Sequence, residues 1–249
     1  MIIKKYKKDK LGMYEILLDN NEYIIVHEDL ILKYELLLNK NINELLINKL
    51  KIENNIYLNY SLALKYLSKK LRSTKEIEDY LQKRLLDNND ISKIIAMLKS
   101  NNYLNDSKYA KAYINDHINL TMDGPLKITN NLIKLGISEE LILENISVFT
   151  SDLLNNKITK LIEKYIKINR NKSSYVLKQY IINNIINLGY KNEDILNILS
   201  NYILSDNKDI YEKEYLKLYN KYKNKYSGKD LDNKVKLAMA MKGFKKIDE

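Results

Sequence analysis

The chain has 249 residues, of which 45% are hydrophobic, and this is enough to build a hydrophobic core. Six glycines and one proline are too few for the turns of an all-β fold, so the composition favours long helices. The sequence has no cysteine, which excludes disulfides and thiolate metal sites. The net charge of +10 suggests an anionic partner such as nucleic acid or an acidic protein, although heavy use of Lys, Asn, Ile and Tyr through AT-rich codons would also produce it.

The N-terminal segment differs from the rest of the chain. Residues 2–26 place apolar and polar positions in short bursts around a turn signal, Asp19-Asn20-Asn21, which predicts a hairpin of strands near 13–18 and 22–26. Residues 28–55 then follow a spacing near 3.6, typical of a helix. We expect residues 1–55 to form a small N-terminal cap, a β-hairpin with helix.

From about residue 56 the sequence repeats itself. A helix that ends in an apolar pair, or in Gly plus an apolar residue, recurs at separations of 51, 53 and 54 residues, at Leu85-Leu86, Gly136-Ile137, Gly189-Tyr190 and Gly243-Phe244. Each interval has room for three helices. We therefore expect an all-α fold of tandem three-helix repeats over residues 56–104, 105–149 and 150–204, with a partial fourth repeat over 205–249.

Local signals agree with these helix boundaries. Glycine at a helix end accepts the left-handed conformation that a side chain disfavours, and three of the four markers contain it. Ser73 with Glu76 forms a capping-box pattern, and Pro125 stands where its missing N–H costs nothing. The Ser73 capping box and Pro125 are each expected to begin the second helix of their repeat.

Two stretches resemble the RecX family. Residues 63–84 contain Arg-Ser-x-x-Glu between two amphipathic helices, here at 72, 73 and 76. Further on, the chain is similar to the family's signature of a Leu-x-Asp turn, an aromatic-Ala pair and a Gly-Pro followed by basic and Ile positions. The matching residues are Leu104, Asp106, Tyr109, Ala110, Tyr113, Gly124, Pro125, Lys127 and Ile128. The chain departs from the family where basic residues usually flank the Gly-Pro, because it has Asp123 and Leu126 there.

The resemblance covers residues 60–148 most specifically and implies both a fold and a role. The implied fold is an elongated, curved array of three-helix units. The implied role is regulation of the RecA recombinase, without catalysis, by binding RecA filaments on DNA during repair, recombination and the SOS response. Such a protein would be cytoplasmic, consistent with a sequence that has no apolar run of secretory or membrane-spanning length. We expect a monomer that needs no cofactor.

Basic residues are the candidate contacts with RecA or single-stranded DNA. Residues 56–104, 150–204 and 205–249 each carry a net charge of +4, whereas 105–149 carry −2 and 1–55 are neutral. Lys65, Lys69 and Arg72 follow helical spacing and are expected to share one face, for which a solvated polar face is the alternative. The full candidate set is Lys65, Lys69, Arg72, Lys75, Arg84, Lys127, Lys134, Lys213, Lys217 and Lys221.

Other patterns leave two interpretations open. The tyrosines at 211, 215, 219, 222 and 226, with lysines beside them, could stack on single-stranded bases, but such a stripe is also typical of a buried helix face. His117 is interpreted as a packed residue at the edge of the core rather than a ligand. No metal site or catalytic set is apparent in the sequence. The alternative function is a direct DNA-binding protein with helix-turn-helix-like repeats, although three arginines offer little for base recognition.

Overall fold

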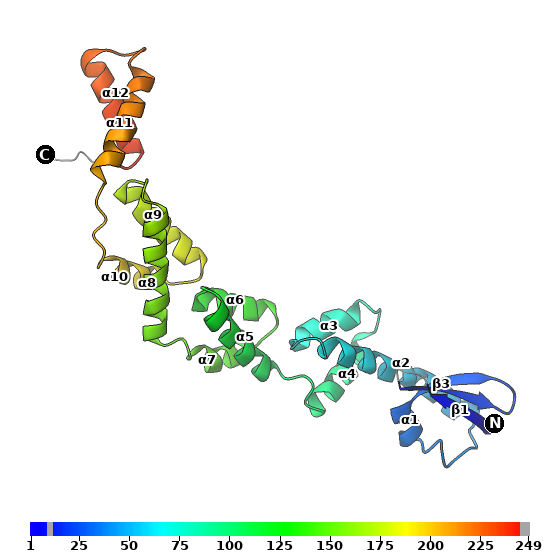
Figure 1. Cartoon of the computed structure of the whole chain (residues 1–249). Helices are drawn as coiled ribbons and strands as arrows, with labels where there is room; N and C mark the ends of the chain where they lie inside the picture. Colours follow the sequence, from blue (N-terminus) through cyan, green and yellow to red (C-terminus); the bar gives the residue numbers. More distant parts are fainter. Residues whose placement is uncertain (9–11, 245–249) are drawn as a thin grey trace. The chain divides into compact units, whose positions relative to one another are not determined.

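The structure is a computed structural model that describes residues 1–8 and 12–244 (Figure 1). Its N-terminal part contains a three-stranded antiparallel sheet in the order β1-β2-β3, made of β1 (Ile3–Lys8), β2 (Met13–Leu18) and β3 (Tyr23–His27). The predicted hairpin is confirmed, because β2 pairs with β3 and the turn between them places Asn21 at φ 64°. Strand β1 was not predicted.

The sheet packs one face against two helices, α1 (Glu28–Lys33) and α2 (Glu44–Leu67). Ile16, Leu18 and Val26 from the strands share a core with Leu30 of α1 and Leu50 of α2, all of them buried. Helix α2 then continues without a break across the expected boundary at residues 55–56. It does so because its C-terminal half, including buried Tyr60 and Ala63, packs into the next core.

The chain after α2 is helical throughout its described part, as expected, with strands confined to the first 27 residues. The first repeat adds two helices to α2, and the next two segments contain three helices each. Two helices follow residue 205 in the described part, which ends at residue 244. The described helices after α2 are α3 (Thr74–Gln82), α4 (Asn88–Ser100), α5 (Asp106–Leu120), α6 (Pro125–Lys134), α7 (Glu139–Ile146), α8 (Ser151–Ile168), α9 (Ser174–Asn187), α10 (Asn192–Leu199), α11 (Lys208–Tyr222) and α12 (Gly228–Met241).

The predicted helix ends are confirmed in detail. Ser73 and Glu76 form a complete capping box at the start of α3, and α6 begins at Pro125. Gly136, Gly189 and Gly243 have φ values of 78°, 89° and 78°, so each takes the left-handed conformation that ends a helix. Leu85 has φ 61° at the corresponding position of the first repeat. A leucine there carries the steric strain that glycine avoids.

Three groups of helices each enclose a hydrophobic core of their own. Helices α2, α3 and α4 bury Ile77, Leu81 and Ile94, while α8, α9 and α10 bury a second set around Ile162 and Ile181. Helices α11 and α12 enclose a smaller core that includes Leu218 and Val235.

The chain divides into two compact units. One comprises Met1–Ala112 with Ile133–Leu141, and the other comprises Tyr113–Leu132 with Ile142–Glu249. Each candidate surface described below lies within one of these units.

Candidate partner-binding surfaces

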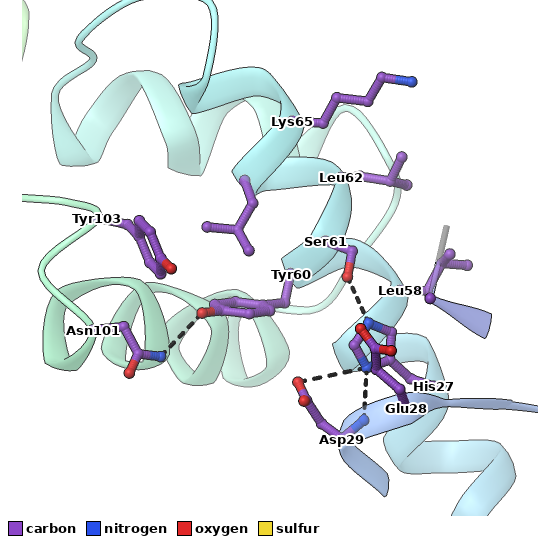
Figure 2. Close-up of a pocket in the computed structure, with 12 residues that line it drawn as sticks. His27, Glu28, Asp29, Leu58, Tyr60, Ser61, Leu62, Lys65, Asn101 and Tyr103 are labelled. Atoms are coloured by element: carbon purple, nitrogen blue, oxygen red, sulfur yellow. Dashed lines mark hydrogen bonds and ion pairs between the residues drawn. The ribbon is translucent and has the colours of Figure 1, made fainter. Parts of the chain in front are cut away.

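An open cleft of about 600 Å³ lies where the end of β3 meets α2 and the loop after α4 (Figure 2). Buried His27 lies in this cleft with its Nε2 atom 2.7 Å from the Ser61 hydroxyl oxygen. Its Nδ1 atom lies 3.5 Å from a carboxylate oxygen of Asp29. The cleft thus brings together Ser, His and Asp, the residue types of a nucleophilic triad, which sequence reasoning did not find.

The hydrogen-bond geometry of His27 favours a structural role over catalysis by this set. The backbone N–H of Asp29 donates to His27 Nδ1 at 3.3 Å, because His27 caps the N-terminus of α1. In the tautomer whose Nδ1 accepts this hydrogen bond, Nε2 carries the proton and donates it toward Ser61. A general base needs the opposite tautomer, with Nε2 free to accept the serine proton. The contacts of His27 instead anchor β3 and α1 to α2.

Lys65, Lys69 and Arg72 do not share a helical face, so this expectation is wrong. Helix α2 ends at Leu67, which leaves Lys69 and Arg72 in the turn that follows. Arg72 stacks on the Tyr66 ring with its guanidinium carbon 3.5 Å from the ring centroid. The same side chain is 11% exposed and forms an ion pair with Glu76 at 3.2 Å. Arg72 therefore stabilises the turn between α2 and α3.

Lys65 and Lys69 remain exposed, and Figure 2 shows the Lys65 side chain directed away from His27 and Ser61. Within residues 1–8 and 12–244 neither lysine has an ion pair. Two other candidates of the first repeat do have intramolecular partners. Lys75 donates to the Lys134 carbonyl at 3.2 Å, and Arg84 donates to the buried Asn59 side chain at 2.6 Å.

Consecutive repeats meet at a recurring contact that involves the predicted glycines. The C-terminal glycine of one repeat's second helix lies against the first turn of the preceding repeat's second helix. A Cβ atom on Gly136 would lie 2.8 Å from Lys75 Cβ, and one on Gly189 would lie 2.4 Å from the Lys127 nitrogen. These distances are too short for a side chain, so glycine is required by the contact as well as by φ.

The Gly-Pro pair takes part in one of these junctions. The Gly124 N–H donates to the Leu188 carbonyl at 2.6 Å, and the Leu126 N–H donates to the Gly189 carbonyl at 3.1 Å. The C-terminal carbonyls of α9 are thus satisfied by N–H groups at the start of α6. A Cβ atom on Gly124 would lie 2.5 Å from the Gly189 carbonyl oxygen, which explains why this position has no side chain.

The Leu-x-Asp turn provides a second recurring link. A carboxylate oxygen of Asp106 accepts a hydrogen bond from the Thr74 N–H at 2.8 Å, at the start of α3. Asp206 accepts one from the Ser174 N–H at 2.5 Å, at the start of α9. Sequence reasoning missed Asp206, although Leu204-Ser205-Asp206 repeats the motif. The corresponding residue of α6 is Pro125, which has no N–H to satisfy.

Asp123 organises a polar cluster between α5, α6 and α8. Its carboxylate pairs with Lys127 at 2.7 Å and with the His117 ring at 3.2 Å. Buried Lys157 donates to the carbonyls of Ile118 and Thr121, both at 2.7 Å, at the end of α5. Burial lowers the pKa of Lys157, and the nearby Asp123 carboxylate opposes this shift. Lys127 is therefore held by an intramolecular ion pair, and His117 is a packed residue as expected.

Helix α11 places its core-facing tyrosines and two of its candidate lysines on different sides. At about 100° per residue, Lys213 and Lys217 lie on the side opposite to Tyr211 and Tyr215, whereas Lys221 lies about 80° from Tyr211. Both of these tyrosines pack against the core of α11 and α12. This packing supports the buried-face interpretation of the stripe. Tyr219 and Tyr226 are the more exposed members, at 36% and 39%.

The remaining candidate lysines are exposed at the surface, and these are Lys134, Lys213, Lys217 and Lys221. Lys221 lies over the Tyr222 ring at 5.4 Å. In the part of the chain that the structure describes, no group of three or more His, Asp or Glu side chains could hold a metal ion. Nor does any described helix combine the length and apolar character needed to cross a membrane.

Together, the N-terminal sheet and the linked three-helix units define a helical-repeat protein. A family model described as "RecX, first three-helix domain" matches residues 60–98. Regulatory protein RecX of Streptococcus pneumoniae (strain 70585) is 32% identical over 248 residues, which cover 98% of this chain and 94% of the relative. Regulatory protein RecX of Listeria innocua serovar 6a is 28% identical over 235 residues, covering 93% and 87%. The chain belongs to the RecX family of regulatory proteins.

Two solved structures support the fold. A crystal structure of regulatory protein RecX matches with a TM-score of 0.72 and 24% sequence identity. The match covers 80% of this chain and 98% of the chain in that structure. The crystal structure of RecX from Lactobacillus salivarius matches with a TM-score of 0.56 and 30% sequence identity. The match covers 60% of this chain and 97% of the chain in that structure.

Proposed function

We propose that this chain binds RecA filaments on DNA and restrains filament extension and ATP-coupled strand exchange. Its membership of a family of regulatory proteins, along nearly the whole chain, is the observation that carries this proposal. The protein acts in the cytoplasm as a monomer, without a cofactor or chemistry of its own, in DNA repair, recombination and the SOS response.

The proposed mechanism is steric, and the junctions between repeats support it. A regulator that contacts neighbouring filament subunits needs a surface whose parts keep their spacing. The Gly136 contact is closely packed within the first compact unit, and the Gly189 and Gly243 contacts are closely packed within the second. We therefore expect surfaces within one unit to keep the spacing that is needed to hinder addition of the next subunit.

Among the candidate residues, the exposed lysines without an ion pair are the proposed contacts. These are Lys65, Lys69, Lys134, Lys213 and Lys217, which form no ion pair with any other residue of 1–8 and 12–244. Their ammonium groups are available to acidic RecA side chains or to phosphate. The other candidates, Arg72, Lys75, Arg84, Lys127 and Lys221, have the intramolecular contacts described above and contribute less to binding.

Charge reversal at Lys65 and Lys69 tests this proposal. Both side chains are exposed, so Lys65→Glu with Lys69→Glu should leave the helical signal and melting temperature nearly unchanged. Inhibition of RecA strand exchange should weaken and should depend less steeply on salt. A matched control reverses the exposed Lys40 and Lys51, in the segment with no net charge. Equal inhibition by both double variants contradicts a role for Lys65 and Lys69.

A further inference from the structure

The outer face of the N-terminal sheet presents an ordered set of side chains. Cross-strand partners point to the same side of a sheet, so the pairing register defines two rows on this face. One row contains Lys5, Leu17 and Tyr23, and the next contains Lys7, Glu15 and Ile25. The lysines therefore form a column along β1, parallel to a column of Tyr23 and Ile25 along β3.

The aromatic and aliphatic side chains of this face are open to solvent. Tyr23 is 61% exposed and Ile25 is 59% exposed. Their neighbours in β3, Ile24 and Val26, are buried in the core on the opposite face, where α1 and α2 pack. Tyr23 and Ile25 suit a strand by propensity, and with half-buried Leu17 beside Tyr23 they form one contiguous apolar patch on this face. A contiguous exposed patch of this kind is a candidate binding surface.

The charges beside this apolar column favour an anionic, unpaired strand as the occupant. Lys5 is exposed and has no ion pair among the described residues, while the side chain of Lys7 is 78% exposed with Glu15 at 3.6 Å. Along β1 these two lysines are separated by about 7 Å, the rise of two strand residues. Tyr23 lies two strands away, about 10 Å from the lysine column. This arrangement offers cations to a phosphate backbone and a ring to the bases beside it.

We propose that this sheet face, made of Lys5, Lys7, Tyr23 and Ile25, binds single-stranded DNA without sequence preference. Phosphates lie along the lysines of β1, and bases contact Tyr23 and Ile25 on β3. The proposal goes beyond regulation of RecA, because it gives the N-terminal domain its own affinity for DNA. An acidic peptide would use the lysines but would gain little from the aromatic column, so single-stranded DNA is the better match.

Binding of a fluorescent thymidine oligonucleotide to the full chain, without RecA, tests the role of Tyr23. A ring that stacks on a base contributes roughly a fivefold or greater change in affinity. Tyr23→Ser should therefore weaken binding by at least roughly fivefold, whereas Tyr23→Phe should retain it, because stacking needs the ring and not the hydroxyl. An abasic oligonucleotide of equal length should bind wild type and Tyr23→Ser alike. Tyr175→Ser, at a tyrosine that is 57% exposed elsewhere, is the matched control.

The salt dependence of the same titration tests Lys5. Each phosphate neutralised on a single strand contributes about 0.7 to the slope of log affinity against log salt. Lys5→Glu should reduce that slope by about this amount or more and should weaken binding to both oligonucleotides. Lys51→Glu makes the same change of charge at an exposed lysine of α2 and should leave the slope unchanged.

The proposal is overturned if Tyr23→Ser and Lys5→Glu bind the oligonucleotide as tightly as wild type while circular dichroism shows the native helical signal. It is also overturned if these variants keep full DNA affinity but lose inhibition of RecA, since the face would then bind protein. A different result would contradict the proposed function alone: wild-type protein binds the oligonucleotide but leaves RecA activity unchanged.

Discussion

Gly189 provides the sharpest test of the junction between repeats, through the substitution Gly189→Ala. Two effects add. The φ of 89° is one that side chains disfavour, at a cost of about 1–2 kcal/mol. The new Cβ atom would also lie 2.4 Å from the Lys127 nitrogen and 2.5 Å from its Cβ, which forces the backbone to shift. Such overpacking costs roughly 1–3 kcal/mol, so the total expected loss of unfolding free energy is about 2–5 kcal/mol.

Gly228→Ala is the matched control for this prediction. Gly228 also has a positive φ, 54°, but an added Cβ atom would meet nothing within 4 Å. Its substitution should cost only the conformational part, about 1–2 kcal/mol. Urea unfolding followed by circular dichroism gives both values. If the two variants lose the same free energy, the close approach of Gly189 to α6 does not contribute, and our account of the junction is refuted.

Three further predictions follow from other contacts. Leu85→Gly should raise the unfolding free energy by roughly 0.5–1 kcal/mol, because it relieves the strain at φ 61° and Leu85, 94% exposed, loses no buried surface; a lower melting temperature would contradict this. Asp106→Ala should cost about 1–2 kcal/mol in urea unfolding, since the Thr74 N–H loses its acceptor, and an unchanged midpoint would show that water replaces the carboxylate. Burial lowers the pKa of Lys157 from 10.5, so between the lowered value and 10.5 the unfolded chain binds more protons and stability rises with pH. The stability of wild type relative to Lys157→Met should therefore increase as the pH rises toward 10.5, and a constant or opposite difference would exclude the burial effect.

Local features of the fold could be predicted because the residues that specify them are adjacent in sequence. The capping box of Ser73 and Glu76 and the start of α6 at Pro125 are examples. Strand β1 was missed because Ile3 is its only fully buried residue, so IKKYKK lacks the apolar alternation that marks a strand. Its place in the sheet depends on pairing with β2.

The candidate site was harder to predict because its chemistry depends on contacts between distant residues. Spacing alone placed Arg72 on an exposed helical face, whereas the end of α2 at Leu67 turns it toward Tyr66 and Glu76. The pairing of Lys127 with Asp123 could be suspected from their separation of four residues. The close approach of Gly124 to Gly189 could not, because residues 65 positions apart leave no local signal.

The rate of RecA's ATP hydrolysis on single-stranded DNA, measured with increasing amounts of this protein, tests the central claim most directly. A regulator that contacts more than one filament subunit should slow hydrolysis at amounts below one molecule per RecA subunit. The Gly228→Ala variant, which keeps the junctions between repeats, should act like wild type, and Gly189→Ala should inhibit less at equal concentration. An unchanged rate at saturating wild-type protein would contradict the proposal that this chain restrains RecA filaments.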